Sequence, residues 1–139
     1  MSLDSLMQGG YIKKLPISKN KVEDVLSLAK RDVTTAKSIL DENSDWSFSI
    51  AYNAMLQSIR ALMFSKGYRP TGANQHITVV RFAELFLDEE IVTIFDRMRR
   101  KRHSTVYDTA GTISKREAEN AVNTAEKLVQ DIEEMIGDN

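Results

Sequence analysis

The stretch DRMRRKRHSTVYD, which runs from Asp96 to Asp108, concentrates positive charge and contains a histidine and a tyrosine. The chain as a whole is nearly neutral, with 19 Lys and Arg against 20 Asp and Glu, so this charge is a local feature. Arginine offers a planar fork of N–H donors that matches the oxygens of a phosphate. The same run suits the C-terminal half of a helix, where the helix dipole favours cations. Phosphate binding and dipole compensation therefore explain the charge equally well.

Helical spacing places several of these side chains on one face. Arg99 and His103 share a face because they are four residues apart, and Arg100, His103 and Tyr107 also fall together. A neutral imidazole on such a face can take the proton of a ribose 2′-hydroxyl, while arginine stabilises the phosphorane. The product would be RNA cleaved without a metal, with a cyclic phosphate. One imidazole leaves the second proton transfer unfilled, and a two-fold dimer would supply it from the other chain.

Other chemistries lack their residues. The chain has no cysteine, so thiolate chemistry and disulfides are excluded, and this composition fits a cytoplasmic protein. The two histidines, His76 and His103, are not in a metal-ligand spacing, and no glycine-rich phosphate loop precedes a helix. We therefore predict no metal and no cofactor, and we interpret His76 as a packing or capping residue. No apolar run is long enough for a membrane span, and we expect neither a span nor a signal peptide.

The spacing of apolar residues predicts an all-α protein. Apolar side chains recur at three- and four-residue steps, and no segment shows the clean alternation of a strand. The predicted helices cover approximately residues 22–40, 46–66, 75–87, 88–107 and 114–136. We expect Ser44 or Asp45 to cap the second helix, and Ser114 with Glu117 to form a capping box for the last. Four long helices and one short one favour an up-and-down four-helix bundle with one additional short helix.

The chain has the length of one domain. Residues 1–17 contain Gly9, Gly10 and Pro16 and lack periodicity, so we expect a flexible N-terminal arm. Residues 18–139 are then the helical bundle domain.

Three stretches of the chain resemble the HEPN family (higher eukaryotes and prokaryotes nucleotide-binding domain). SIAYNAMLQSIRALMFSKGYRP looks like the core helix of the family, and His76 falls where many members have a histidine after the following loop. RRKRHSTVYD and TISKREAENAVNTAEKLVQDI are similar to its motif helix and closing helix. The resemblance extends from about Val22 to Ile136. It implies a bundle fold and an RNase toxin that is usually dimeric and often encoded beside a nucleotidyltransferase-type antitoxin.

The family motif is an arginine followed, after four to six residues, by a histidine. Arg102 matches the arginine, His103 matches the polar residue that usually follows it, and Tyr107 stands in the histidine position. This is a departure, although some branches of the family end the motif in tyrosine. A second register pairs Arg97 with His103, but helical angles place these two residues about 120° apart, so we prefer the first.

The resemblance therefore implies a catalytic set and a binding set. The catalytic set is Arg102, His103 and Tyr107, with His103 or Tyr107 in the role of the motif histidine. The nucleic-acid-binding set is Arg97, Arg99, Arg100 and Lys101. We expect a homodimer through the motif helix that engages RNA or a nucleotide, with RNase activity. The alternative is a non-catalytic interaction partner or regulator that works with a nucleotidyltransferase.

Overall fold

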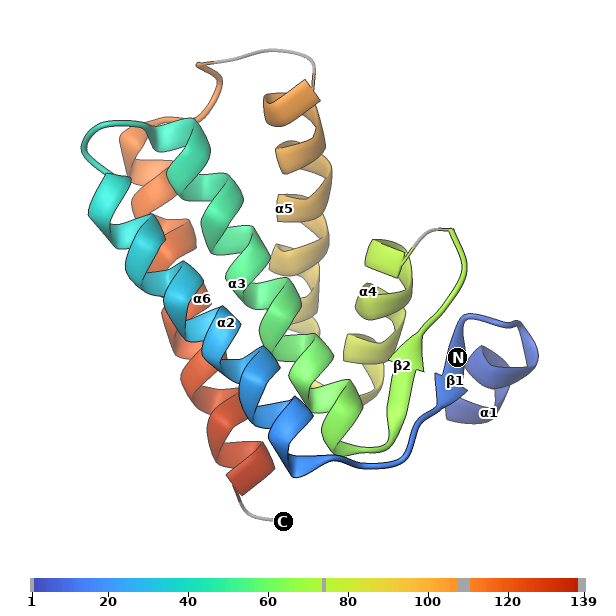
Figure 1. The fold of residues 1–139 in the computed structure, drawn as a ribbon. Coiled ribbons are helices and arrows are strands. Elements are labelled where there is room, and N and C mark those ends of the chain that lie inside the picture. Colours follow the sequence, from blue (N-terminus) through green and yellow to red (C-terminus); the bar gives the residue numbers. More distant parts are fainter. Residues whose placement is uncertain (1, 74, 108–110, 138–139) are drawn as a thin grey trace.

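The computed structural model describes residues 2–73, 75–107 and 111–137, without the side chains of residues 105–107. Its elements, in chain order, are α1 (Leu3–Gln8), β1 (Ile12–Lys14), α2 (Lys19–Ile39), α3 (Ser44–Ser65), β2 (Tyr68–Pro70), α4 (Gln75–Phe86), α5 (Glu89–Tyr107) and α6 (Lys115–Gly137). The four long helices run alternately up and down, and α4 lies beside α3 and α5 (Figure 1). The prediction of an all-α up-and-down bundle with one short additional helix is confirmed.

Helix α3 is the centre of the bundle and contacts α2, α4, α5 and α6. It is buried on nearly every side because small side chains alternate with large ones along it. Ala51, Ala54 and Ala61 are fully buried and let neighbouring helices approach closely, while Tyr52 and Met55 fill the space between helices. Most side chains of α3 are therefore packed against neighbouring helices. No helix within the described residues has both the length and the apolar character to cross a bilayer.

The N-terminal segment differs from its expectation. The sequence predicts a flexible arm for residues 1–17, whereas the structure has α1 and β1 there, with Leu6 and Ile12 buried. Strand β1 pairs antiparallel with β2, with Ile12 opposite Pro70. The prediction that the chain contains no strand is wrong here, because three-residue strands are too short to show alternation in a sequence. The division of the chain into two parts at residue 18 stays a prediction.

Residues at the N-termini of α3 and α6 hold the C-terminal end of α5 and the segment after it in place. Asn43, not Ser44 or Asp45, caps α3 by accepting a hydrogen bond from the backbone of Trp46 (3.0 Å). The Asp45 carboxylate is thereby left to accept from the backbone N–H groups of Gly111 and Ile113, which follow α5. Asp45 thereby connects the segment after α5 to the start of α3.

At the start of α6, Ser114 accepts from the backbone N–H of Glu117 (3.0 Å), as one half of the predicted capping box requires. The carboxylate of Glu117 forms an ion pair with Lys101 of α5 (2.5 Å). Helix α5 is thus fastened to α6 as well as to α3.

Replacing Ile12 by Ala should destabilise the protein by about 2–4 kcal/mol, because the side chain of Ile12, at the start of β1, is only 1% exposed. Ile17 is 65% exposed, so Ile17→Ala is a matched control that should cost less than about 0.5 kcal/mol. Urea unfolding followed by circular dichroism measures both. Equal effects of the two substitutions would show that the N-terminal segment is not part of the folded core.

Candidate functional site

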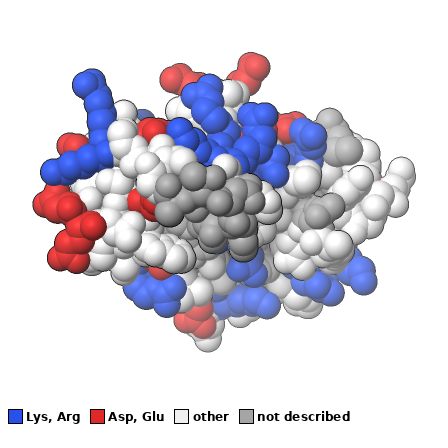
Figure 2. Space-filling view, turned by 90° about the horizontal axis from the view of Figure 1, so that it is seen from above, with Lys and Arg blue, Asp and Glu red and all other residues white. Residues whose placement is uncertain are grey.

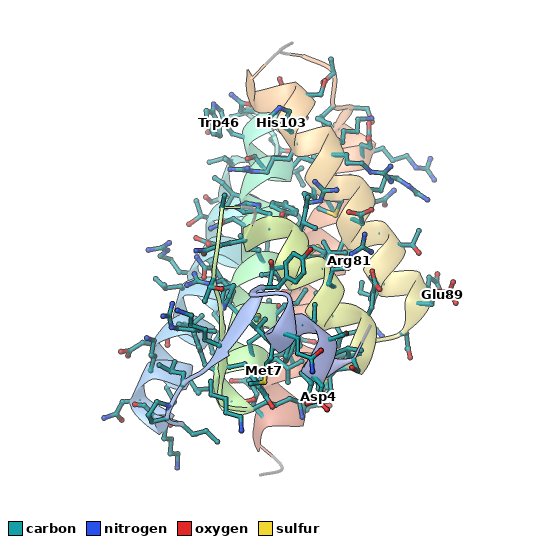
Figure 3. All side chains as sticks on the ribbon, turned by 90° about the vertical axis from the view of Figure 1, so that its right-hand side faces the viewer. Asp4, Met7, Trp46, Arg81, Glu89 and His103 are labelled. Carbon is teal, nitrogen blue, oxygen red and sulfur yellow. The ribbon has the colours of Figure 1, made fainter. Side chains whose placement is uncertain are left out.

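The basic residues of α5 divide into two groups. Arg99 and Arg102 are half-buried, and both act electrostatically on side chains of α3 and α4. Arg97, Arg100 and His103 are exposed. Figure 3 shows His103 near the end of α5, at the same end of the bundle as Trp46 at the start of α3. Seen from this end in Figure 2, Lys and Arg side chains gather in the upper part of the view, with a few carboxylates among them.

Arg102 is fixed in place by α3. Its Nε donates a hydrogen bond to the Ser49 hydroxyl (3.0 Å), and its guanidinium lies over the ring of Tyr52, 5.5 Å from the centroid. Ser49 and Tyr52 are both buried, so neither can move aside easily. A guanidinium above an aromatic ring is attracted by the negative face of that ring. These contacts hold the motif arginine in one position without neutralising its charge.

Tyr52 joins three helices. Its ring stacks on Phe95 of α5 at 5.2 Å with an interplanar angle of 12°. Its hydroxyl lies 2.9 Å from Nδ1 of His76 in α4, and these two rings also stack, at 5.8 Å and 21°. Burial raises the pKa of the Tyr52 hydroxyl well above its ordinary range, although Arg102 and Arg99 act in the opposite direction. The phenol is therefore protonated at neutral pH.

His76 is held in its neutral form. His76 is exposed as a residue, and its Nδ1 contacts Tyr52 of α3. Burial is the largest cause that lowers the pKa of His76, followed by the positive charges of Arg102, Arg99 and Arg60. Arg60 projects from α3, and its Nε is buried without a hydrogen-bond partner among the described residues. Three guanidiniums, from α3 and α5, thus act on His76.

Three more cations of α5, Arg99, Arg100 and Lys101, are paired with carboxylates. Asp96 accepts from Arg99 (Nη2, 2.9 Å; Nε, 3.0 Å) and lies 3.8 Å from Arg100. Lys101 pairs with Glu117. Ion pairs at a protein surface contribute about 0–1 kcal/mol each, and Arg99 with Asp96 is the most shielded of these three pairs. Tyr107 belongs to α5, but its side chain lies outside the described residues.

Sequence reasoning missed Ser49 and Tyr52 as site residues and assigned His76 to packing. His76 does contact the preceding long helix, as that interpretation requires, but it does so beside Arg102. The small-aromatic-x-Ala start of α3, Ala51 to Ala54, was the signal that could have identified Tyr52. Within the described residues, no three His, Asp or Glu side chains lie close enough together to hold a metal ion.

The electrostatic contact between Arg102 and His76 gives a prediction. Arg102→Ala should raise the pKa of His76 toward its ordinary value, because it removes the largest cause of the lowering other than burial. An NMR titration of the ring protons measures this pKa. Arg81→Ala is the matched control, because Arg81 lies on the same helix as His76 but pairs with Glu84.

The lowered pKa of His76 makes the stability of the protein depend on pH. Because the folded protein binds a proton at His76 less readily than the unfolded chain, stability is lost as the pH falls below about 6.5 and through the folded pKa. A His76 pKa that is unchanged or lower in Arg102→Ala would contradict this geometry.

Comparison with known proteins agrees with the resemblance seen in the sequence. The family model of the HEPN domain matches residues 22–135. Among solved structures, TT1696 from Thermus thermophilus is similar with a TM-score of 0.64 and 20% identity, over 83% of this chain and 98% of that one. ST0689, an archaeal HEPN homologue, has a TM-score of 0.62 and 16% identity, over 83% and 97%. No curated protein gave a significant match. The chain belongs to the HEPN domain family.

Proposed function

We propose that this HEPN protein binds RNA or a nucleotide through its phosphates at the end of α5, with Arg102 as the central phosphate ligand. The observation that carries the proposal is the fixed position of Arg102 between Ser49 and Tyr52. An arginine that is already ordered loses less side-chain entropy when it binds, so its hydrogen bonds contribute more to affinity. A cation retained in a half-buried position, with a hydroxyl and a ring as its contacts, is suited to an anionic ligand.

Four further cations of α5 extend this site. Arg97, Arg99, Arg100 and Lys101 lie on the same helix and would follow a phosphate backbone beyond the phosphate held by Arg102. The pairing of Arg99 and Arg100 with Asp96, and of Lys101 with Glu117, balances their charge in the free protein and is replaced when a polyanion arrives. Binding of this kind releases counterions, so the affinity falls steeply with salt.

RNA cleavage is the activity that this site would support. His103 follows Arg102 directly and is exposed, so it can reach a ribose 2′-hydroxyl next to the bound phosphate. In that step the 2′-hydroxyl proton passes to His103, the 2′-oxygen bonds to phosphorus, and the bond from phosphorus to the 5′-oxygen breaks. Arg102 stabilises the phosphorane, and Tyr107 positions the substrate. The departing 5′-oxygen needs a proton, which a second copy of α5 would supply.

In the proposed dimer, the second copy packs against the side of α5 that faces away from α3 and α4. This helix contacts α3 and α4 on one side, while Arg97 and Arg100 are exposed. A two-fold dimer through α5 would bring two histidines to one cleft. A nucleotidyltransferase-type antitoxin is the partner that the family suggests.

The second candidate function is a non-catalytic partner or regulator that works with such a nucleotidyltransferase. The presence of Tyr107 in the histidine position of the motif favours it.

Incubation of the purified protein with a mixed RNA pool in EDTA separates the two candidates. We expect cleavage that persists in EDTA, ends in cyclic phosphates, and falls by at least about a hundredfold in both Arg102→Ala and His103→Ala. Lys127→Ala is the control for loss of one positive charge, because Lys127 is exposed on α6 and pairs with Asp131. RNA that binds in a salt-dependent way but stays intact would support the regulator. RNA that neither binds nor is cleaved would contradict the proposal.

Sedimentation equilibrium tests the shared site. At micromolar concentration we expect a dimer that is weakened by Arg97→Glu and Arg100→Glu together, because these exposed residues lie on the uncovered side of α5. Glu substitution of Lys127 serves as the control at a distant surface. A monomer at every concentration would show that one chain must supply both proton transfers or that cleavage does not occur.

A further inference from the structure

His76 is an exposed residue, yet its Nδ1 contacts the hydroxyl of the fully buried Tyr52. The Nδ1 atom lies 2.9 Å from Tyr52 Oη, whereas His76 as a whole is an exposed residue. A histidine that serves packing alone would bury the ring and gain from its apolar surface. In an imidazole the two nitrogens are separated by one carbon and point in divergent directions. Because Nδ1 points at Tyr52, Nε2 points away from it. The outward nitrogen is therefore the one that a ligand can reach.

The hydrogen bond to Tyr52 decides which nitrogen carries the proton. The phenol is protonated, and His76 is its one hydrogen-bond partner within the described residues. The cations closest to Tyr52, Arg102 and Arg99, are donors and cannot accept. A buried O–H without an acceptor is costly, so the Tyr52 hydroxyl donates to Nδ1. The neutral ring then carries its proton on Nε2.

The surroundings of this N–H fit an anion. Arg102 and Arg99 on α5 and Arg60 on α3 all act on His76 with positive potential. Asp96 is the acidic side chain that acts on Tyr52, and it is paired with Arg99. A neutral donor among guanidiniums adds a hydrogen bond to an oxyanion without adding another repelling charge.

We propose that His76, held by Tyr52, is a neutral hydrogen-bond donor to a phosphate oxygen bound at Arg102. This inference rests on the proposed phosphate site and extends it from α5 to α4. It also separates the roles of the two histidines. His76 in this tautomer has no lone pair directed outward, so it binds and does not accept the 2′-hydroxyl proton. The proton acceptor of the cleavage step remains His103.

Nitrogen NMR measures the tautomer directly. The chain has two histidines, so His103→Gln leaves His76 as the only imidazole. We expect the Nε2–H form at neutral pH in this variant, and a mixture of both tautomers when Tyr52→Phe is added. A proton found on Nδ1 would overturn the inference, because Nε2 would then be an acceptor.

Affinity for a short 2′-O-methyl oligouridylate, which cannot be cleaved through its 2′-oxygen, tests the hydrogen bond to phosphate. His76→Asn keeps an acceptor for Tyr52 near the Nδ1 position but has no N–H at the Nε2 position. His76→Gln places an amide N–H close to where Nε2 stands. Fluorescence anisotropy should show roughly 3- to 10-fold weaker binding by His76→Asn and nearly unchanged binding by His76→Gln.

The outcomes distinguish the two levels of the proposal. If the wild-type protein binds and both variants bind equally well, the inference about His76 is wrong while the phosphate site on α5 stands. If the wild-type protein does not bind at any salt concentration, the proposed function fails and this inference fails with it. Inorganic phosphate in the same titration shows whether the phosphate alone is recognised, and it should shift the His76 resonances in the His103→Gln variant.

Discussion

The hydroxyl of Tyr52 is the constraint on which the candidate site depends. It is fully buried where α3, α4 and α5 meet, and His76 accepts its hydrogen bond. A buried hydroxyl left without a partner costs about 1–3 kcal/mol, so folding places His76 next to it. The same ring also contacts Phe95 and the guanidinium of Arg102. One aromatic residue therefore determines where the histidine of α4 and the motif arginine of α5 lie.

Positive charge is concentrated around this residue, as the proposed phosphate site requires. The chain is close to neutral, yet Arg60, Arg99 and Arg102 all act on His76, and one carboxylate, Asp96, is shared by two arginines. Guanidiniums that approach one another repel, and folding alone gives no reason to gather them. In the proposed site, a bound anion would relieve that repulsion. The neutral state of His76 limits the repulsion in the free protein and, in that proposal, would leave one more N–H for the ligand.

Local patterns were sufficient to predict the fold. The apolar periodicity located all five helices of the bundle, and the family resemblance, not the charge pattern, singled out Arg102 as the motif arginine. The capping residue of α3 was placed one or two positions too late, because Asn43, Ser44 and Asp45 are all good caps and only the backbone conformation distinguishes them. Strands β1 and β2 were missed because each has three residues and its partner is distant in sequence.

The architecture of the site was less predictable because its contacts also join residues that are distant in sequence. The contact of Arg102 with Ser49 spans 53 residues, and that of Tyr52 with His76 spans 24. Helical angles relate residues within one helix, so they grouped Arg100 and His103 on one stripe but did not show that Arg102 turns toward α3. The tautomer of a histidine depends on its hydrogen-bond partner, which only the tertiary structure supplies.

A crystal structure of the protein with a bound 2′-O-methyl dinucleotide tests the central claim most directly. The account predicts one phosphate with its oxygens within hydrogen-bond distance of both the Arg102 guanidinium and Nε2 of His76, with the Tyr52 hydroxyl still bonded to Nδ1. A phosphate held elsewhere on α5, with His76 out of its reach and Arg102 still bonded only to α3, would contradict it.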